Sequence, residues 1–308
     1  MPRAVTIRSL PRAFELVKDM QARGLEWGES YRGLGRAAIA AILRGQMERS
    51  VDEHLDRMAS LDAVVAAFHA RPLRQRYRVL MLDGVVLSRK TGAGAIRRPV
   101  LVALGLRPDG KKEVIDFHLA ASESAAEWER FLGSLIRRGL TGDGLEMICV
   151  DGGTGLLAAL PTAYPAIPVQ RCWAHKIRNV LDKVRKADQP AVKADLHAVM
   201  NARTLPQARS AAHRFAQRWK QNYPKAVRCL RGDLDELLTC WRYKSLDERK
   251  KVRTTNAIER RFREVRRRTR PMGVFSDRTS MDRILFAVFN HENRNQGVST
   301  PLLLTQTF

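Results

Sequence analysis

The sequence lacks any apolar run long enough to cross a membrane. The longest run near the N-terminus, Ala37 to Leu43, has seven residues, whereas a bilayer-spanning helix needs roughly 20. The N-terminus also lacks the charged start, apolar middle and small-residue cleavage site of a secretory signal. We therefore expect a cytoplasmic protein.

Cysteine is also scarce, with four residues in 308. Cys149, Cys172, Cys229 and Cys240 form no Cys-x-x-Cys pair. This spacing argues against a disulfide framework and against a four-cysteine zinc site.

Acidic residues are few compared with basic ones, at 32 Asp and Glu against 55 Lys and Arg, which gives a formal net charge of +23. Hydrophobic residues make up 44% of the chain, which is typical of a globular protein. An excess of positive charge this large indicates a polyanionic partner. Nucleic acid, an anionic membrane and polyphosphate all fit it.

Apolar periodicity predicts helices at the start of the chain and a sheet from Tyr77 onward. The turn-forming segment 107–111 indicates a hairpin, so we expect the first three strands to be antiparallel. A helix over 124–139 then leads to a fourth strand, as in a crossover unit. The predicted strands are 78–82, 98–106, 113–118, 145–150 and 169–173. The predicted helical regions are 10–69, 124–139, the segment after Gly155, the segment from His175, 181–244, 255–268 and 282–290.

Two aspartates follow predicted strands directly, and each is followed by glycine. They are Asp83 and Asp151. In open α/β sheets, ligands bind beyond the carboxyl ends of the strands, so two such carboxylates can converge on one site. The alternative is that each Asp-Gly pair is an ordinary turn.

A third carboxylate, Glu259, lies in a segment crowded with positive charge. Residues 249–270 contain 11 Arg or Lys and two acidic residues. Helical geometry places Glu259 at the edge of the apolar stripe that begins at Ile258, within reach of a site at the sheet edge. The alternative is a simple ion pair with Arg263 or Arg266.

Phosphodiester chemistry would explain why three carboxylates and many arginines occur together. Oxygen ligands suit Mg²⁺ or Mn²⁺, and two such ions about 4 Å apart can hold the attacking and leaving oxygens. The arginines would bind the DNA backbone.

Cys172 and His175 have the spacing that begins many zinc sites, but no second pair with fitting spacing follows. We therefore expect no zinc there. His175 is expected beside the carboxylates, donating to a phosphate or to a metal ligand, with Cys172 packed in the strand. A purely structural histidine is the alternative.

Four motifs in this order resemble those of the Mutator-type insertion-sequence transposases of bacteria. The resemblance covers the chain from about Tyr77 to the C-terminus. It implies an α/β, RNase H-like core with a mixed five-stranded sheet, an all-helical insertion, a DDE triad of Asp83, Asp151 and Glu259, and Cys172 with His175 as an accessory signature. The motifs are Leu82-Asp83-Gly84, Cys149-Val-Asp-Gly-Gly153, Gln170-Arg-Cys-Trp-Ala-His-Lys-Ile-Arg-Asn179, and Arg253-Thr-Thr-Asn-Ala-Ile-Glu-Arg260 with Phe275 beyond.

The resemblance also implies a domain order. Residues 1–72 would form a helical N-terminal arm, a DNA-binding region shorter than in relatives. Residues 73–180 would begin the catalytic core, 181–248 would be the insertion, and 249–308 would complete the core with the basic helix. The expected DNA contacts are Arg253, Asn256, Arg260, Arg263, Arg266, Arg267, Arg270, Lys176 and Arg178.

The predicted function is that of a transposase that cleaves and joins DNA with Mg²⁺ or Mn²⁺. Its partners would be double-stranded DNA, as element ends and target, and a second copy of the chain in a homodimer. The protein would associate with the nucleoid. Two alternatives stay open from the residues: a catalytically idle DNA-binding regulator, and a two-metal nuclease that does not join strands.

Overall fold

The computed structural model describes most of the chain after residue 60. The chain divides into two compact units, 1–64 and 65–308, and the second is described below. The predicted helices before residue 60 lie outside the described residues, as does the expectation of a shortened N-terminal region. None of the described helices has the length and apolarity needed to cross a bilayer. The described residues are 61–74, 76–91, 94–269 and 278–298.

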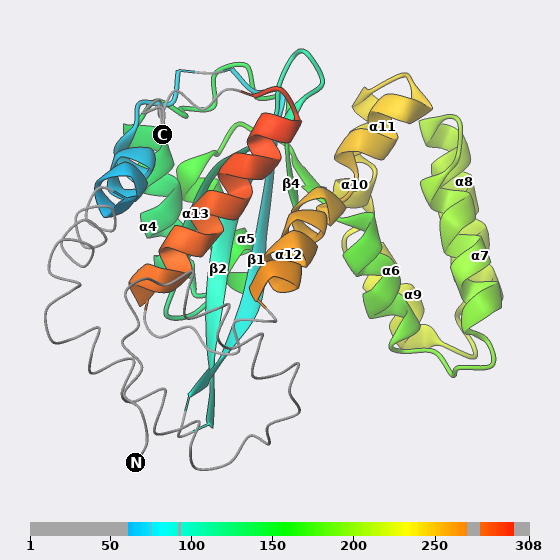
Figure 1. The fold of residues 1–308 in the computed structure, drawn as a ribbon. Coiled ribbons are helices and arrows are strands. Elements are labelled where there is room, and N and C mark those ends of the chain that lie inside the picture. Colours follow the sequence, from blue (N-terminus) through cyan, green and yellow to red (C-terminus); the bar gives the residue numbers. More distant parts are fainter. Residues whose placement is uncertain (1–60, 75, 92–93, 270–277, 299–308) are drawn as a thin grey trace, which may run out of the picture. The chain divides into compact units, whose positions relative to one another are not determined.

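A mixed sheet of five strands forms the centre of the second unit (Figure 1). Its spatial order is β3-β2-β1-β4-β5. The first three strands are antiparallel, and β4 and β5 run parallel to β1. This is the strand order of an RNase H-like fold, which confirms the predicted fold class. The strands are β1 (Val79–Thr91), β2 (Gly94–Leu106), β3 (Lys112–Leu119), β4 (Met147–Val150) and β5 (Val169–Arg171).

The expected hairpin between β2 and β3 is confirmed, but the prediction that β1 ends before Asp83 is wrong. Strand β1 continues eight residues further, to Thr91, and pairs with β2 down to Gly94. Gly84 is therefore part of an extended strand and not of a turn. The β-branched Val85 and Val86 that follow favour continued pairing.

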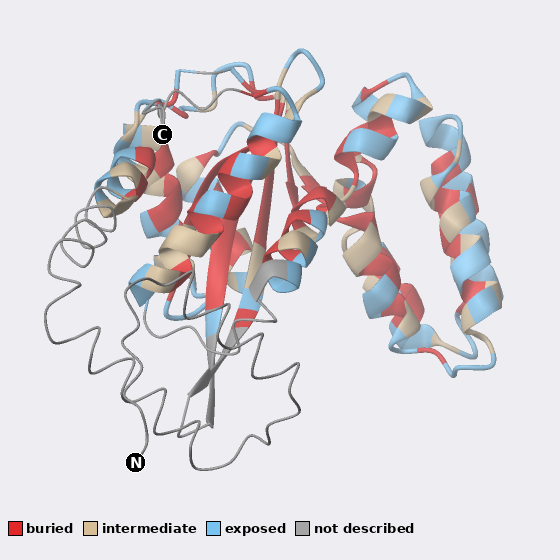
Figure 2. Ribbon diagram, in the orientation of Figure 1, coloured by how far each residue is buried: buried red, intermediate tan, exposed pale blue. Residues whose placement is uncertain are grey.

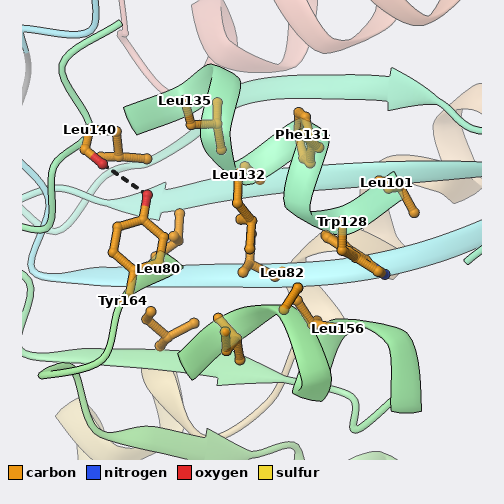
Figure 3. Close-up of a cluster of buried hydrophobic side chains, with 14 of the residues drawn as sticks. Leu80, Leu82, Leu101, Trp128, Phe131, Leu132, Leu135, Leu140, Leu156 and Tyr164 are labelled. Carbon is orange, nitrogen blue, oxygen red and sulfur yellow. Dashed lines mark hydrogen bonds between the residues drawn. The ribbon is translucent and has the colours of Figure 1, made fainter. Parts of the chain in front are cut away.

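Two helices, α4 (Ala125–Arg137) and α5 (Thr154–Ala163), cover one face of the sheet. The Ser124 hydroxyl accepts a hydrogen bond from the Glu127 amide at 3.4 Å and so caps α4. Tyr164, which directly follows α5, donates to the carbonyl of Leu140, which lies shortly after α4, at 2.8 Å (Figure 3). The apolar stripe of α4, all buried in this core, consists of Trp128, Phe131, Leu132 and Leu135.

Helices α12 (Asn256–Thr269) and α13 (Arg278–Asn295) cover the opposite face (Figure 1). Phe289 of α13 joins this layer, with ring centroids 5.3 Å from Phe117 of β3 and 5.5 Å from Phe262 of α12. Alternate residues of a strand point to opposite faces. Asp83 therefore has the orientation of Met81, toward the face that α12 covers.

Between β5 and α12 the described chain is helical, as predicted for 181–244. These helices bury a hydrophobic cluster separate from the α4–α5 core (Figure 2). Gln170 of β5 ties them to the sheet, because its Nε2 donates to the Leu237 carbonyl at 3.0 Å. Trp173 Nε1 of α6 donates to the same carbonyl at 2.9 Å. The elements are α6 (Trp173–Leu181), α7 (Gln189–Met200), α8 (Leu205–Trp219), α9 (Pro224–Gly232), α10 (Leu234–Leu237), the 3-10 helix η2 (Thr239–Arg242) and α11 (Leu246–Val252).

His69 should make the stability of this fold depend on pH. It lies 2.7 Å from Asp116 and 3.6 Å from Asp282. Burial alone lowers the pKa of His69, but the hydrogen bonds and charges of the two aspartates outweigh it and raise the pKa from 6.5 to about 9. The resulting stabilisation, about 3 kcal/mol, is complete below pH 6.5 and disappears as the pH rises through 9.

The measurement is urea unfolding of the wild type and of His69→Gln at pH 6 and pH 9.5. Other groups titrate in the same window, including Lys112, whose pKa burial lowers to about 8. The difference between the two proteins therefore isolates His69. An equal loss of stability in both would contradict the prediction.

Candidate active site

Asp83 and Glu259 line an open cavity of about 780 Å³ where the sheet meets α12. The remaining lining comes from β1 just beyond Asp83, from α6, and from the basic face of α12. Of the two acidic residues, Asp83 comes from the sheet and Glu259 from α12, which also supplies the arginines of the lining. The other lining residues are Gly84, Val85, Val86, His175, Asn256, Arg260, Arg263 and Arg266.

Asp83 is the most deeply buried carboxylate of the cavity, with 3% of its surface exposed. Its Oδ2 atom is buried without a hydrogen-bond partner. Burial, followed by the negative charges of Asp151 and Glu259, raises the pKa of Asp83 to about 7, although His175 and a hydrogen bond from Thr255 act in the opposite direction. A buried carboxylate in this state is stabilised by any cation that enters the cavity.

Asp151 follows β4 directly, and β4 lies parallel to β1. The register pairs Leu82 with Val150, so Asp83 and Asp151 are the next residues on two neighbouring strands. The turn that follows holds the Asp151 side chain, whose Oδ1 accepts a hydrogen bond from the Gly153 amide at 3.0 Å. The structure therefore brings these two predicted site residues together.

Glu259 reaches the same cavity from the first turn of α12, and its side chain is 41% exposed. Its Oε1 atom lies 3.5 Å from His175 Nε2 and 3.8 Å from Arg178 Nη2. Both cations belong to α6. These contacts tie the start of α12 to α6, and the negative charge of Glu259 acts on Asp83 across the cavity.

Cys172 and His175 connect these two helices. The Cys172 sulfur accepts hydrogen bonds from the amide of Thr255 at 3.3 Å and from its hydroxyl at 3.6 Å, and Thr255 immediately precedes α12. The interaction with Cys172 and the charges of Asp83 and Asp151 raise the pKa of His175 to about 9, against the effect of burial. His175 is therefore positively charged at neutral pH, between Cys172 on one side and Glu259 on the other.

The donor set fits Mg²⁺ or Mn²⁺ when substrate supplies part of the coordination. In the described part of the chain, no three His, Cys, Asp or Glu side chains are grouped closely enough to form a metal cage by themselves. Mg²⁺, however, keeps several waters and takes one or two carboxylates plus substrate phosphate. The unpartnered Oδ2 of Asp83, beside Asp151, is an oxygen of the kind that such an ion takes as a ligand.

The predicted DNA contacts divide into two groups. Asn256, Arg260, Arg263 and Arg266 line the cavity, and the exposed Arg178 contacts Glu259 beside it. Arg267 is exposed and pairs with Glu264, and Arg270 lies outside the described residues. Arg253 and Lys176 are buried instead. Arg253 donates to the Met200 carbonyl at 2.6 Å and to Asn201 Oδ1 at 2.9 Å, and Lys176 pairs with Asp233.

Sequence reasoning missed two residues of this site. Glu123 lies so close to Gly84 that a side chain there would meet its carboxylate at about 3 Å, and burial and the charge of Asp151 raise its pKa. Thr255 anchors the start of α12. Of the two, Thr255 carries a sequence signal, since a threonine just before a helix is a common cap.

The chain matches the model of the transposases of the Mutator family over residues 31–297. It belongs to this family. The predicted family is thereby confirmed, and the motifs that carried it contain the side chains that meet in the cavity.

Individual relatives are transposases of bacterial insertion sequences. The chain is 31% identical to the IS905 transposase of Lactococcus lactis, over 76% of this chain and 58% of that one. It is 36% identical to the IST2 transposase of Acidithiobacillus ferrooxidans, over 68% and 70%, and 37% identical to the IS6120 transposase of Mycolicibacterium smegmatis, over 66% and 62%. The chain thus spans less than two thirds of the length of several curated relatives that it matches.

Among solved structures, the chain is similar to the Drosophila P element transposase strand transfer complex. The sequence identity is 13% and the TM-score is 0.28. The similarity covers 76% of this chain and 70% of that chain.

The contact between Cys172 and Thr255 leads to a prediction about α12. Replacing Cys172 by Ala removes the acceptor of the Thr255 amide, so this buried donor loses its partner at a cost of about 1 to 3 kcal/mol. Hydrogen exchange of the Thr255 amide should accelerate about tenfold or more, because the lost bond lowers the free energy of the opening that exposes this amide. Cys172→Ser retains an acceptor and should restore part of the protection.

Cys240→Ala is the matched control, because Cys240 is equally buried but lies in η2, where its sulfur contacts the Leu237 carbonyl. In Cys240→Ala, the Thr255 amide should exchange hydrogen at the wild-type rate. Equal exchange in Cys172→Ala and Cys240→Ala would show that the sulfur does not hold the start of α12.

Proposed function

We propose that this protein is a DNA transposase of an insertion sequence, which cleaves and joins DNA strands with Mg²⁺ or Mn²⁺. The observation that carries the proposal is the buried carboxylate of Asp83, whose Oδ2 lacks a partner, next to Asp151 and opposite the basic face of α12. Membership of the Mutator family supports the same reaction.

In this proposal, Asp83, Asp151 and Glu259 hold the divalent ions. Those ions would supply Lewis-acid stabilisation of the attacking and leaving oxygens. Glu259 is exposed enough to turn from its ion pairs with α6 toward the aspartates, since its contacts at 3.5 and 3.8 Å are longer than strong hydrogen bonds. The carboxylates then neutralise the charge of the ions within the cavity.

The cations at the rim bind the substrate backbone. Arg260 and Arg263 line the cavity and are exposed, so they can reach phosphates without leaving a buried partner. His175, charged at neutral pH, can donate to a phosphate oxygen when Glu259 moves. Each role uses a residue that already faces the cavity.

The partners follow from the chemistry. Double-stranded DNA of the element ends and of the target would be the substrate, encountered at the nucleoid in the cytoplasm. One chain presents one such cavity in its described part, and an element has two ends. We therefore include a homodimer on DNA in the proposal.

The first prediction of this proposal concerns the three carboxylates. Asp83→Asn, Asp151→Asn and Glu259→Gln keep the shape of each side chain but remove the charge that holds a divalent ion. Each change should abolish metal-dependent cleavage and joining, and double changes should be no worse, because residues that act as a unit are not additive. DNA binding should persist in all three. The assay follows nicking and joining of DNA that carries the ends of the parent element, with Mg²⁺ or Mn²⁺.

Glu264→Gln is the matched control, since Glu264 lies on the same helix and pairs with Arg267 at 2.9 Å. It should retain activity. Full activity in Glu259→Gln would refute the proposed triad. Nicking without joining by the wild type would identify a nuclease, and DNA binding without either reaction would identify a regulator.

The second prediction concerns phosphate contacts. Each neutralised phosphate releases counterions, so the logarithm of the DNA affinity should fall linearly with the logarithm of salt concentration. Replacing Arg260 and Arg263 by Gln should reduce the slope by about 0.9 per lost phosphate contact. Fluorescence anisotropy between low and physiological salt measures it.

The control removes the same charge elsewhere, with Arg214→Gln and Lys225→Gln on the exposed surface of α8 and α9. Its slope should stay close to that of the wild type. Equal slopes for both double variants would show that the basic face of α12 has no special role in binding DNA.

A further inference from the structure

The turn after β4 carries a constraint that the predicted triad does not explain. Gly152 follows Asp151 with φ at +101°, in the left-handed region that favours glycine. A side chain at Gly152 would also meet the Arg171 guanidinium, with Nη2 at 2.0 Å and Cζ at 2.4 Å. The guanidinium therefore lies directly against the backbone of the residue that follows Asp151.

Arg171 is the last residue of β5, and the register pairs it with Val150 of β4. Its side chain is only 11% exposed. Two carboxylates from outside the sheet hold it: Asp233 at 3.4 Å from Nη2 and Glu236 at 3.5 Å from Nη1. The Lys176 ammonium pairs with the same Asp233, so this carboxylate joins two cations of the motif that begins at Gln170.

We propose that Arg171 is a positioning residue for Asp151, and that Asp233 and Glu236 hold it in place. The guanidinium forms a surface on which the turn after Asp151 rests, so the direction of the Asp151 carboxylate depends on it. Asp233 lies between α9 and α10, and Glu236 lies within α10. The helices between β5 and α12 thereby contribute to the geometry of the metal site. Because that metal site is part of the function proposed above, the role of Arg171 rests on that proposal.

The shape of the side chain matters to this role. A guanidinium is planar and can lie against a backbone while it contacts two carboxylates in fixed directions, whereas an ammonium is a compact point charge on a flexible stem. Arg171→Lys therefore keeps the charge and loses the flat contact with Gly152. Asp233→Asn and Glu236→Gln keep the guanidinium but remove the two negative charges that fix its position.

The test measures Mn²⁺ binding to the protein in complex with duplex DNA, whose phosphates complete the coordination. Binding is followed by calorimetry and by electron paramagnetic resonance, with the free duplex as the blank. Arg171→Lys should weaken Mn²⁺ binding by about tenfold or more, the range found when groups that orient metal ligands are changed. Asp233→Asn combined with Glu236→Gln should weaken it in the same direction. Adding these two changes to Arg171→Lys should have little further effect, because all three act through one contact.

Asp235→Asn is the matched control, since Asp235 lies on the same short helix, is largely exposed and pairs with Arg209. It should bind Mn²⁺ as the wild type does. Thermal unfolding is measured on every variant. A lower melting temperature with unchanged Mn²⁺ affinity in Arg171→Lys would overturn the proposal, because that is the result of a purely structural role.

The same experiment separates this inference from the proposed function. If Asp83→Asn and Asp151→Asn bind Mn²⁺ as well as the wild type, the metal site itself is wrong. If those variants lose Mn²⁺ while Arg171→Lys and the Asp233→Asn, Glu236→Gln double variant keep it, the triad stands and the role of Arg171 is refuted.

Discussion

The burial of the Asp83 carboxylate in the centre of an apolar sheet is the constraint on which the site depends. An ionised carboxylate in such surroundings costs several kcal/mol unless it is paired, and the negative charge of Asp151 adds to that cost. Two nearby groups, His175 and Thr255, act against it. The remaining cost keeps the pKa of Asp83 raised, at about 7. A divalent ion in the cavity would therefore stabilise the ionised form of Asp83. The buried, unpartnered Oδ2 that lowers the stability of the fold is thus the same atom that is available to bind an ion.

The residues that surround Asp83 come from segments far apart in the chain, and a few polar contacts join them. The Trp173 amide donates to the Arg253 carbonyl at 3.0 Å, next to the contact of Cys172 with Thr255. These bonds fix the start of α6 against the start of α12. His175 and Glu259 each lie within the first turns of their helices, so their relative position follows from this junction. The helices between β5 and α12 can vary in their outer surface without moving the junction.

The sequence allowed the sheet, the hairpin and α4 to be predicted, because apolar periodicity and turn residues are local signals. The family was predicted from the resemblance of four motifs. The extension of β1 past Asp83 was missed because Asp-Gly is usually a turn, whereas here Gly84 lies within the strand, close to the Glu123 carboxylate. The burial of Lys176 was also missed. A lysine on a helix has no local signal for the distant Asp233 that neutralises it, and only the folded chain brings the two together.

The basic helix α12 shows how such a dense positive charge is tolerated in a folded protein. Arg261 is 7% exposed and turns inward, where its guanidinium donates to the carbonyls of Ala257 and Lys112 at 3.1 and 3.4 Å. Arg260 and Arg263 point outward along the cavity. One arginine therefore donates to backbone carbonyls and holds the helix on the sheet, while its neighbours keep their charge available. Repulsion within the helix is relieved in part by the pair of Glu264 with Arg267 at 2.9 Å, and DNA phosphate at the rim would relieve it further.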